Sequence, residues 1–497
     1  MEVVCWGGIM SGFLDAVNEI VWGAPALVLI LGVGLFLSIR TGFAQIRLFP
    51  EAVRQFLRKL RPQSDREGVS SFQALCTALA ATVGTGNLVG VAGAICLGGP
   101  GSIFWMWVCA LLGMVTKFAE ATLAVRFRIR QDGEFIGGPM YMIQNGLSVR
   151  WHRLATVYCF FGVVAAFGVG NATQINACIT SINQMITDFG GSVSRKTDLL
   201  IGAVMAFSVG AMLFGGAKRI GQAAEFLVPF VSCAYMLLCI GVLVTKRAEI
   251  SRALSSILLG AFSPKAVTGG MLGSVFQALR VGVSRGVFTN EAGMGTASIA
   301  HASARVEHPA QQGLMGIMEV FLDTIVICTM TALVILCSGV PIPYGMDIGA
   351  ALTVAAFSAV YGNWVSVFLA LSLCCFAFAT VLGWGLYGAR CAQFLFGKGA
   401  WKVFALIQIG IVILGAVMQT GTIWSLSETV NGLMAIPNLI TLVLLSPELR
   451  TLTIEYQSLC GKGAAGGTYE NFNQRKPLSA LSHAEVSSLR SRGKKTG

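Results

Sequence analysis

A short polar stretch inside an apolar segment is the part of this sequence best suited to bind a small solute. It covers residues 80–87, with the sequence AATVGTGN, and the apolar residues on both sides of it predict helix. A helix interrupted at the depth of a membrane exposes backbone N–H and C=O groups, which lipid cannot satisfy. Such groups can hold a small zwitterion or a cation, as in proteins with discontinuous membrane helices. The stretch therefore predicts a binding site within the membrane.

Thr85 and Gly86 open the second half of this interrupted segment, and they suit the binding of a carboxylate. A carboxylate needs hydrogen-bond donors and a favourable dipole, and the first N–H groups of a helix supply both. Gly86 also has no side chain to block a close approach. The alternative is that the glycines only let helices pack closely, which is common in membranes. The presence of Asn87 at the same interruption favours a binding function.

A second apolar segment, residues 266–302, contains Gly282 and Gly286 in the run RVGVSRG, and we expect an interruption there as well. Carbonyl groups freed at that interruption would bind an ammonium group. Gln277 and Phe276 come just before it. Phe276 would either wall a small pocket and exclude bulky side chains or be an ordinary core aromatic residue. Paired interruptions at corresponding positions are a sequence sign of a transporter binding site.

Polar and charged side chains also occur in the middle of other apolar segments. Gln174 and Asn176 should face neighbouring helices, because polar amides are costly in lipid, and they would either bind substrate or join two helices. Lys117 and Glu120 are three residues apart, which predicts an ion pair along one helix. The four histidines are expected near the membrane surfaces or in the tail, at His152, His301, His308 and His483.

The rest of the chain is suited to holding such a site inside a membrane. Of its 497 residues, 55% are hydrophobic and 12% are charged, and the mean hydropathy is +0.73. A membrane-spanning helix needs about 20 apolar residues, and by that rule we expect about eleven spans. The fold class predicted from the sequence is therefore an all-α polytopic membrane protein. The approximate spans are 14–40, 70–98, 101–127, 154–187, 198–214, 221–245, 266–302, 310–339, 362–389, 400–420 and 423–447.

The basic residues indicate how the chain is oriented. The formal net charge is +12, and seven basic residues crowd into residues 40–66. Because cytoplasmic loops carry the excess of Lys and Arg, we expect the N-terminus outside and the C-terminus in the cytoplasm, with the protein in the cell (inner) membrane. The positive charge would attract anionic membrane lipid. There is no soluble basic domain to bind nucleic acid, and we infer no obligate protein partner.

The predicted spans divide the chain into four parts. Residues 1–69 hold the first span and a basic cytoplasmic loop, residues 70–245 hold a first block of five spans, and residues 246–447 hold a second block of five. Because five is an odd number, the two blocks would be inverted relative to each other. Residues 448–497 are rich in Gly, Ser, Lys and Arg, which predicts a disordered basic tail.

Four stretches resemble the alanine or glycine:cation symporter family, also called the sodium:alanine symporters. They lie in order along the chain: ATVGTGNLVGVAG at 81–93, GGPGSIFWMW at 98–107, SRGVFTNEAGMG at 284–295 and AFATVLGWGLYG at 377–388. The resemblance implies the leucine-transporter fold, a five-plus-five inverted repeat, here preceded by one extra helix. It also implies sodium-coupled uptake of small neutral amino acids such as alanine and glycine by alternating access.

The resemblance also implies roles for individual residues. The run VGTGN at 83–87 matches the unwound part of the first core helix in that fold. Gln174 would help to hold the substrate carboxylate. The co-transported sodium ion would be bound by the carbonyls of Ala80, Val83 and Phe376 and by the hydroxyl of Thr380. Asn87 would serve a second ion. The alternative for Thr380 is that its hydroxyl bonds to its own helix, as helical threonines usually do.

Three other functions were weighed against this one. The run GVSRG at 282–286 fits the G-x-S-x-G motif of hydrolases, but that motif needs a preceding strand and none is expected, so we predict that the protein is not an enzyme. A channel would need a continuous lined pore, and paired interruptions fit alternating access better. A carrier of the same fold that is coupled to protons instead of sodium is the remaining alternative.

Overall fold

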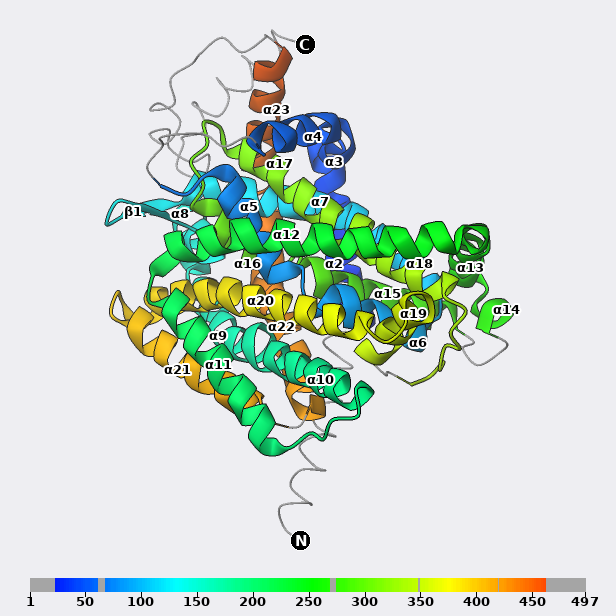
Figure 1. The fold of residues 1–497 in the computed structure, drawn as a ribbon. Helices are drawn as coiled ribbons and strands as arrows, with labels where there is room; N and C mark the ends of the chain where they lie inside the picture. The colour runs from blue at the N-terminus through cyan, green and yellow to red at the C-terminus, as the bar shows by residue number, and fades with distance from the viewer. Residues whose placement is uncertain (1–22, 61–67, 269–273, 347–348, 419, 462–497) are drawn as a thin grey trace.

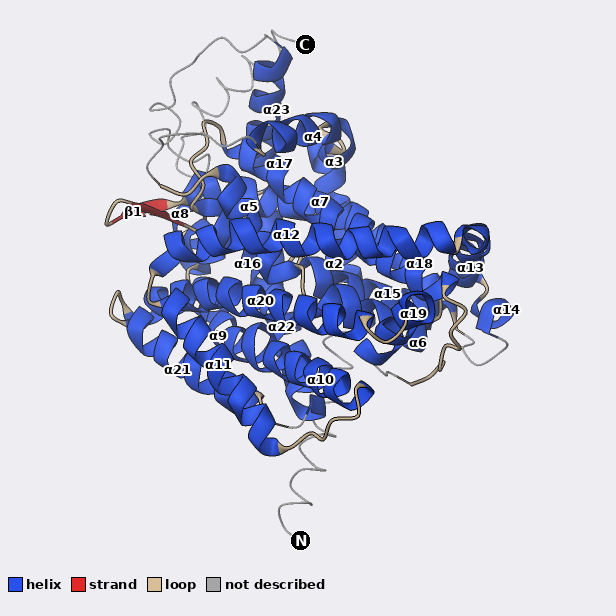
Figure 2. Ribbon diagram, viewed as in Figure 1, coloured by secondary structure: helices blue, strands red, loops and turns tan. Residues whose placement is uncertain are grey.

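The computed structural model describes residues 23–60, 68–268, 274–346, 349–418 and 420–461, and most of them are helical (Figures 1 and 2). The start of the first predicted span, part of the basic loop and the predicted tail beyond residue 461 lie outside the described residues. The helices and strands are, in chain order, α2 (Ala24–Thr41), α3 (Ala44–Arg47), α4 (Phe49–Lys59), α5 (Ser71–Thr82), η1 (Gly86–Gly90), α6 (Val91–Gly98), α7 (Gly101–Phe127), β1 (Ile129–Gln131), β2 (Glu134–Ile136), α8 (Pro139–Gly146), η2 (Val149–Trp151), α9 (Arg153–Phe167), η3 (Gly168–Ala172), α10 (Thr173–Asp188), α11 (Arg195–Leu213), α12 (Gly216–Thr245), η4 (Arg247–Glu249), α13 (Ile250–Phe262), α14 (Pro264–Thr268), α15 (Val275–Asn290), α16 (Thr296–Ala302), α17 (Pro309–Val320), η5 (Phe321–Cys328), α18 (Thr329–Cys337), α19 (Ala350–Tyr361), α20 (Val365–Phe396), α21 (Ala400–Gly415), α22 (Thr420–Leu444) and α23 (Ser446–Gly461).

Local sequence signals set where several of these helices begin and end. The Ser70 hydroxyl accepts a hydrogen bond from the Gln73 N–H, and the Gln73 side chain accepts one from the Ser70 N–H, so α5 begins with a capping box. The Ser274 hydroxyl caps α15 by accepting a bond from the Gln277 N–H. Gly42, with φ +66°, ends α2 in the left-handed conformation that glycine adopts without strain.

The length and composition of the helices fit a protein that crosses a membrane several times. Within the described residues, six helices are long and apolar enough to span a bilayer, and there are eight spans if each of two bent helix pairs counts as one. The bent pairs are α5 with η1 and α6, at 50°, and α22 with α23, at 61°. Every predicted span overlaps at least one of the described helices. The prediction of an all-α polytopic membrane protein is confirmed.

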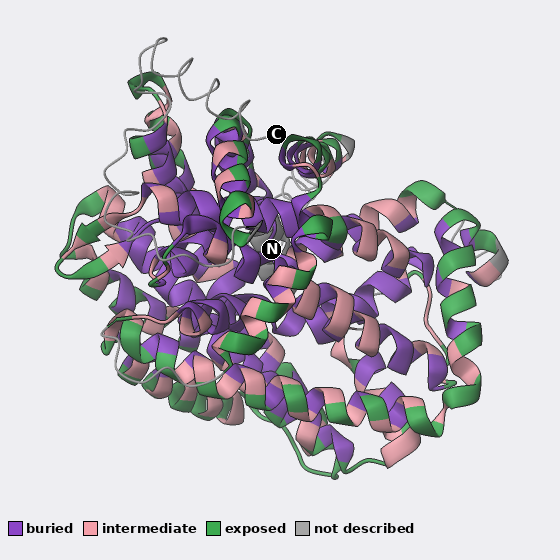
Figure 3. Cartoon of the chain, turned by 90° about the horizontal axis from the view of Figure 1, so that it is seen from above, coloured by how far each residue is buried: buried purple, intermediate pink, exposed green. Residues whose placement is uncertain are grey.

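The two ends of the helix assembly differ. Figure 1 shows α12 and α20 running nearly parallel, with the β1–β2 hairpin at one end and α13, α14 and α19 at the other. We call these the hairpin end and the far end. The two strands pair antiparallel, with Arg130 opposite Phe135. Figure 3, seen from above, shows buried segments gathered in the middle of the molecule.

The peripheral helices expose large apolar side chains on their outer faces. Phe207 on α11 is 79% exposed, Phe226 on α12 is 74% exposed and Leu406 on α21 is 62% exposed. Apolar surface of this extent would be unfavourable in water and is typical of helices that face lipid or a partner. We therefore interpret these faces as the lipid-facing surface of the protein.

The prediction of a disordered tail is wrong for residues 450–461, because α23 continues to Gly461. Leu449, Leu452 and Tyr456 are buried, and their spacing places them on one face of a helix. At the hairpin end, α23 is joined to α7 by an ion pair of 2.8 Å between Arg126 and Glu448. The apolar spacing that orders this segment is hidden in the sequence by its otherwise polar composition.

Candidate functional site

The first interruption lies where it was predicted, between α5 and η1. In an uninterrupted helix the Gly84 N–H would bond to the Ala80 carbonyl. Here the Gly84 N–H donates to Asn87 Oδ1 at 2.9 Å, and the Ala80 carbonyl accepts the Thr380 hydroxyl at 3.0 Å. Val83 has the extended angles φ −77° and ψ 103° and turns the chain out of the helix. The break is therefore closed by one local side chain and one side chain from α20.

The second interruption lies between α15 and α16, later than predicted. Glu291, Gly293 and Gly295 all have positive φ, of 52°, 96° and 77°. The N–H groups of both glycines donate to the same carboxylate oxygen, Oε1 of Glu120 on α7, at 3.0 Å each. Asn438 Nδ2 on α22 donates to that oxygen at 2.7 Å and to the Gly293 carbonyl at 2.9 Å. Side chains from α7 and α22 therefore replace the lost helical hydrogen bonds.

The prediction of a break at residues 280–286 is wrong, because α15 runs without interruption from Val275 to Asn290. The glycines there serve close packing against α7. A Cβ on Gly282 would overlap the Ser102 carbonyl, and a Cβ on Gly286 would lie 3.2 Å from the Cβ of Cys109. Glycine in this run therefore marks a helix contact and not a change of backbone direction.

The two interruptions meet beside a small cavity. A Cβ on Gly86 would lie 2.9 Å from the Cγ2 of Thr289, so the glycine lets η1 approach α15. The cavity has a volume of about 10 Å³, room for about one water molecule, and lies between the first interruption, η3, α10, α15 and α20. The residues that line it are Ala81, Thr82, Gly84, Thr85, Gly86, Val169, Gln174, Phe288, Glu291, Thr380 and Trp384.

The cavity has polar groups of both kinds that a zwitterion needs. The Thr85 hydroxyl donates to Gln174 Oε1 at 3.2 Å, and Gln174 Nε2 donates to the Val169 carbonyl at 3.1 Å. As the first residues of the second half-helix, Thr85 and Gly86 have N–H groups without intrahelical partners. The Glu291 carboxylate lies among the lining residues and is 3% exposed. Donors for a carboxylate and an acceptor for an ammonium group therefore border one space.

Glu291 is held firmly at the edge of this cavity. Its Oε1 accepts the Trp384 Nε1–H at 2.9 Å, and its Oε2 accepts the Thr296 hydroxyl at 2.5 Å. The cavity position of Glu291, Phe288 and Trp384 was missed, although all three lie in the stretches that carry the family resemblance.

The residues predicted to bind sodium lie together beside the first interruption. Thr380 donates its hydroxyl to the Ala80 carbonyl, across from α20 to α5, and a Cβ on Gly84 would lie 2.8 Å from the same hydroxyl oxygen. Phe376, one turn before Thr380, is buried in the same apolar cluster as Ala80 and Val83. Oxygen atoms of this kind suit a hard cation.

Asn87 lies next to these residues and contacts a buried carboxylate. Its Nδ2 donates to Asp323 Oδ1 at 2.7 Å and to the Asp323 carbonyl at 3.2 Å. The Thr324 hydroxyl donates to Asp323 Oδ2 at 2.8 Å. Asn87 therefore links the first interruption to η5.

Three residues predicted near the substrate lie elsewhere. Phe276 is 53% exposed at the first turn of α15, and Gln277 Nε2 donates to the Leu97 carbonyl at 2.7 Å. Gly282 packs on α7, as described above. These residues were placed at the site only because the second interruption was expected about ten residues too early, at 280–286 and not at 291–295.

Asn176 and Lys117 also have unexpected partners. Asn176 was predicted to lie at the binding site, and Lys117 was predicted to pair with Glu120 on its own helix. Asn176 Nδ2 donates to the Met418 carbonyl at 3.0 Å and does not line the cavity. Lys117 does not pair with Glu120; its Nζ lies 3.0 Å from Glu319 Oε1 on α17. The i,i+3 pairing is wrong because Glu120 is engaged by the second interruption.

The expectation that His301 lies near a membrane surface is wrong as well. Its side chain is fully buried, and its Nε2 lies 2.8 Å from Glu319 Oε2.

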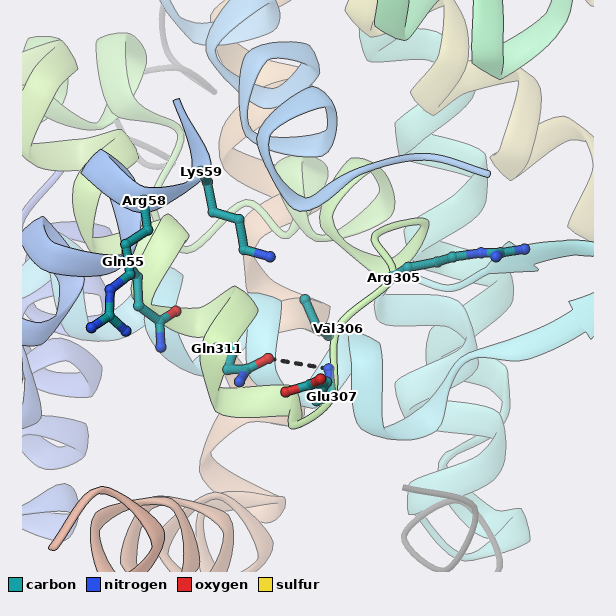
Figure 4. Close-up of a pocket in the computed structure, with 7 residues that line it drawn as sticks. All are labelled: Gln55, Arg58, Lys59, Arg305, Val306, Glu307 and Gln311. Atoms are coloured by element: carbon teal, nitrogen blue, oxygen red, sulfur yellow. Dashed lines mark hydrogen bonds between the residues drawn. The ribbon is translucent and has the colours of Figure 1, made fainter. Parts of the chain in front are cut away.

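A second, larger cavity lies near the hairpin end and is a weaker candidate (Figure 4). It is lined by Gln55, Arg58, Lys59, Arg305, Val306, Glu307 and Gln311, and its volume is about 280 Å³. Figure 4 shows the Arg305 side chain pointing away from Arg58 and Lys59. The basic groups therefore do not converge on one point, and we assign the binding function to the smaller cavity.

Comparison with known proteins identifies the group to which this architecture belongs. A sequence model of the sodium:alanine symporter family matches residues 8–469. The chain belongs to the sodium:alanine symporter family. It is thus a multi-pass membrane protein of an amino-acid transporter family.

Several relatives match over nearly their whole length. The sodium/alanine symporter AgcS of Methanococcus maripaludis is 42% identical over 438 residues, which cover 87% of this chain and 94% of the relative. The probable sodium/glutamine symporter GlnT of Bacillus subtilis is 36% identical, covering 91% and 92%. The putative sodium/proton-dependent alanine carrier protein YrbD of Bacillus subtilis is 34% identical, covering 88% and 90%.

A solved structure shows the fold to which the chain is similar. The crystal structure of MhsT in complex with L-phenylalanine has a TM-score of 0.56 at 13% identity and covers 79% of this chain and 99% of that one. The fold is that of the leucine-transporter type, as predicted.

Proposed function

We propose that this protein is a secondary active transporter that couples the entry of sodium to the uptake of a small neutral amino acid, alanine or glycine, by alternating access. The observation that carries the proposal is the small cavity at the first interruption, where donors, the residue Glu291 and candidate sodium ligands lie together. The names of the relatives support sodium coupling and alanine but do not decide either for this chain.

In the proposed complex, the substrate carboxylate binds to the N–H groups of Thr85 and Gly86 and to the Gln174 side chain. The positive end of the half-helix that begins at Gly86 favours the negative charge. The substrate ammonium group faces the Glu291 carboxylate, which replaces the carbonyls that we expected from a break at 280–286. Phe288 and Trp384 then form the walls around the substrate side chain, so only a small side chain fits.

Sodium would bind between α5 and α20, on the carbonyls of Ala80, Val83 and Phe376 and the Thr380 hydroxyl. In the structure the Thr380 hydroxyl donates to the Ala80 carbonyl. A sodium ion between these two groups would be coordinated by both oxygens. The hydroxyl would then rotate so that its proton points away from the ion. Because the ion ties α20 to the first interruption, it would hold Thr85 and Gly86 in place for the substrate. Asn87 with Asp323 is the candidate for a second ion.

The orientation in the membrane follows from the charges. We place the hairpin end in the cytoplasm and the N-terminus outside, because basic residues crowd into residues 40–66 and because Arg126, Arg128 and Arg130 mark the hairpin end.

The proposal is tested by radiolabelled alanine uptake into proteoliposomes with an inward sodium gradient and, in parallel, an equal potassium gradient. Accumulation with sodium alone is the expected result. Competition by unlabelled glycine, serine and glutamine then ranks the substrates. Equal uptake in the two gradients would contradict sodium coupling.

A proton-coupled carrier is the second candidate, and one relative named as a putative sodium/proton-dependent alanine carrier favours it. Alanine accumulation in sodium-free proteoliposomes under an inward proton gradient would support this reading. Its absence there, with accumulation under a sodium gradient, would exclude it.

A further inference from the structure

The first described helix, α2, ends in a turn that brings the chain to the membrane surface. It has 18 residues, of which one, Arg40, is charged. At the helical rise its length is about 27 Å, close to the thickness of about 30 Å of the hydrocarbon core of a bilayer. Gly42 and Phe43 both have positive φ, of 66° and 55°, so the chain leaves the axis of α2 directly after this length. α3 and α4 therefore begin where the hydrocarbon meets the headgroups.

The exposed apolar face of α2 continues beyond the turn. Val28, Leu35 and Ile39 are 70%, 48% and 65% exposed, and their spacing places them on one face of the helix. Past the turn, Phe43 is 44% exposed and Ile46 is 55% exposed. The surface that we interpret as lipid-facing therefore extends from α2 onto the segment that leads into α4.

The inner face of α4 is fixed to the body of the protein by aromatic contacts. The ring centroid of Phe49 lies 4.9 Å from that of Phe321 in η5. The ring centroid of Phe56 lies 6.3 Å from that of Phe72, in the first turn of α5. Ala52, between the two, is buried. Because this face is held, the opposite face of α4 must remain on the outside.

The outer face of α4 combines arginine with leucine. Arg54, Leu57 and Arg58 are all exposed, and their spacing places them on one side of the helix. Leu57 is 56% exposed, and Leu60 at the end of the helix is 47% exposed. Arg54 forms an ion pair of 2.6 Å with Glu51, but an exposed pair of this kind contributes little and is easily exchanged for another anion. The outer face thus offers both positive charge and apolar surface.

The positive charge at this surface is in clear excess. Residues 40–60 contain five basic residues and one acidic residue, a net charge of +4. Arg47 is held beside the turn, since it donates to the Gly42 carbonyl at 3.2 Å and to Gln457 Oε1 at 3.3 Å. Guanidinium groups bind phosphate well, and their apolar stems can lie along acyl chains. An anionic phospholipid matches both the charge and the continuous apolar surface, whereas an acidic soluble protein matches the charge alone.

We propose that residues 43–60 form a docking surface for anionic phospholipids, whose headgroups bind Arg47, Arg54 and Arg58. Figure 1 shows α4 beside α23, and a hydrogen bond from Gln55 to the Tyr456 hydroxyl joins the two helices. In the orientation proposed above, these lipids belong to the cytoplasmic leaflet. Bound lipid fixes α4, and the aromatic contacts of α4 extend this support to η5 and to the half-helix α5. The binding of lipid does not depend on the transport function.

The test is the lipid selectivity of the purified protein. Delipidated protein in detergent is mixed with equal amounts of phosphatidylglycerol, which is anionic, and phosphatidylcholine, which is not, and native mass spectrometry counts the bound molecules of each. We expect the wild type to prefer phosphatidylglycerol at least about fivefold, and R47Q/R54Q/R58Q to prefer it less than about twofold. R54Q/R58Q keeps the contacts of Arg47 and should lose part of the preference, so the test stands even if the triple variant does not fold. Phosphatidylglycerol should also raise the unfolding temperature of the wild type more than that of either variant.

The matched control removes the same amount of charge elsewhere. R195Q/K196Q/R252Q changes exposed residues on α11 and α13, which Figure 1 shows away from α4, and it should keep the wild-type preference. An equal loss in this control would mean that net charge alone attracts the lipid, and would contradict a defined surface. An unchanged preference in both arginine variants would place the lipid elsewhere. A wild type without preference would overturn the assignment to lipid and leave the surface to an acidic protein.

Discussion

The two interrupted spans are closed in opposite ways. The first interruption, at residues 83–85, uses Asn87 from its own segment and Thr380 from α20, and its remaining N–H groups border the cavity. The second interruption, at residues 291–295, is bonded by Glu120 and Asn438 from neighbouring helices. The first is thus left available to a ligand, whereas the second is completed by the protein itself. The difference assigns binding chiefly to the first and structural support chiefly to the second, with Glu291 as the link.

The largest effect is expected from removing the support of the second interruption. Glu120→Ala leaves the buried N–H groups of Gly293 and Gly295 without an acceptor, and we expect the free energy of unfolding to fall by about 3 kcal/mol or more. Glu120→Gln keeps an acceptor oxygen and should cost less. Thermal unfolding in detergent, with size-exclusion chromatography, measures both. A Glu120→Ala protein as stable as the wild type would contradict the role given to this carboxylate.

The next effect is expected from filling the first interruption. Gly86→Ala places a methyl group 2.9 Å from Thr289 Cγ2, at the edge of the cavity, and we expect alanine uptake to fall at least about tenfold in a folded protein. Gly410→Ala on α21 is the matched control, since a Cβ there meets no atom within 4 Å. If the two variants transported equally well, the cavity at Gly86 would not be the substrate site.

Removal of the Thr380 hydroxyl should weaken sodium binding more than it lowers the free energy of unfolding. We expect Thr380→Ala to raise the sodium concentration for half-maximal uptake about tenfold, which corresponds to about 1.4 kcal/mol. Thr380→Ser keeps the hydroxyl and should stay near the wild type. The measurement is the dependence of initial uptake on sodium at fixed alanine. A normal sodium curve for Thr380→Ala would show that the ion binds elsewhere.

Two amide side chains on α10 distinguish a residue that lines the cavity from one that only joins helices. Gln174→Ala removes a lining group and should raise the KM for alanine about fivefold, whereas Asn176→Ala should change it less than about twofold, because the bond to Met418 lies outside the cavity. Uptake kinetics of the two variants decide this. Equal changes in KM would contradict the assignment of Gln174, and not Asn176, to the cavity lining.

The smallest effect is expected at Phe276. Its side chain is 53% exposed on the first turn of α15, so Phe276→Ala should leave the KM for alanine and for other small amino acids within about twofold of the wild type. Larger amino acids such as phenylalanine should not compete with alanine uptake any better than they do in the wild type. A variant that accepted larger substrates would restore the role expected for this residue from the sequence.

The first interruption could be predicted from the sequence because its determinants are local. Thr82, Gly84, Gly86 and Asn87 lie within six residues of one another, and the bond that replaces the helical one comes from Asn87 itself. The membrane spans were predictable for a similar reason, since about 20 consecutive apolar residues identify a span without any tertiary information.

The second interruption could not be placed in the same way, because its partners are far away in the chain. Glu120 and Asn438 lie 173 and 145 residues from Gly293. In the sequence, Gly282 and Gly286 look like the paired glycines of an interrupted helix, yet in the structure they allow close packing against α7. The pairing of Lys117 with Glu319 was missed for the same reason, as helix periodicity predicts only neighbours on one helix.

The central claim is that the first interruption binds the amino acid and sodium together, so the most direct test is the affinity for alanine with and without sodium. Isothermal titration of the purified protein with alanine, in sodium chloride and in choline chloride of equal ionic strength, measures this. We expect the Kd for alanine to be at least about tenfold lower in sodium, and this difference to shrink in Thr380→Ala, because coupling between two ligands is reciprocal. An equal Kd in the two salts for the wild-type protein would contradict the account.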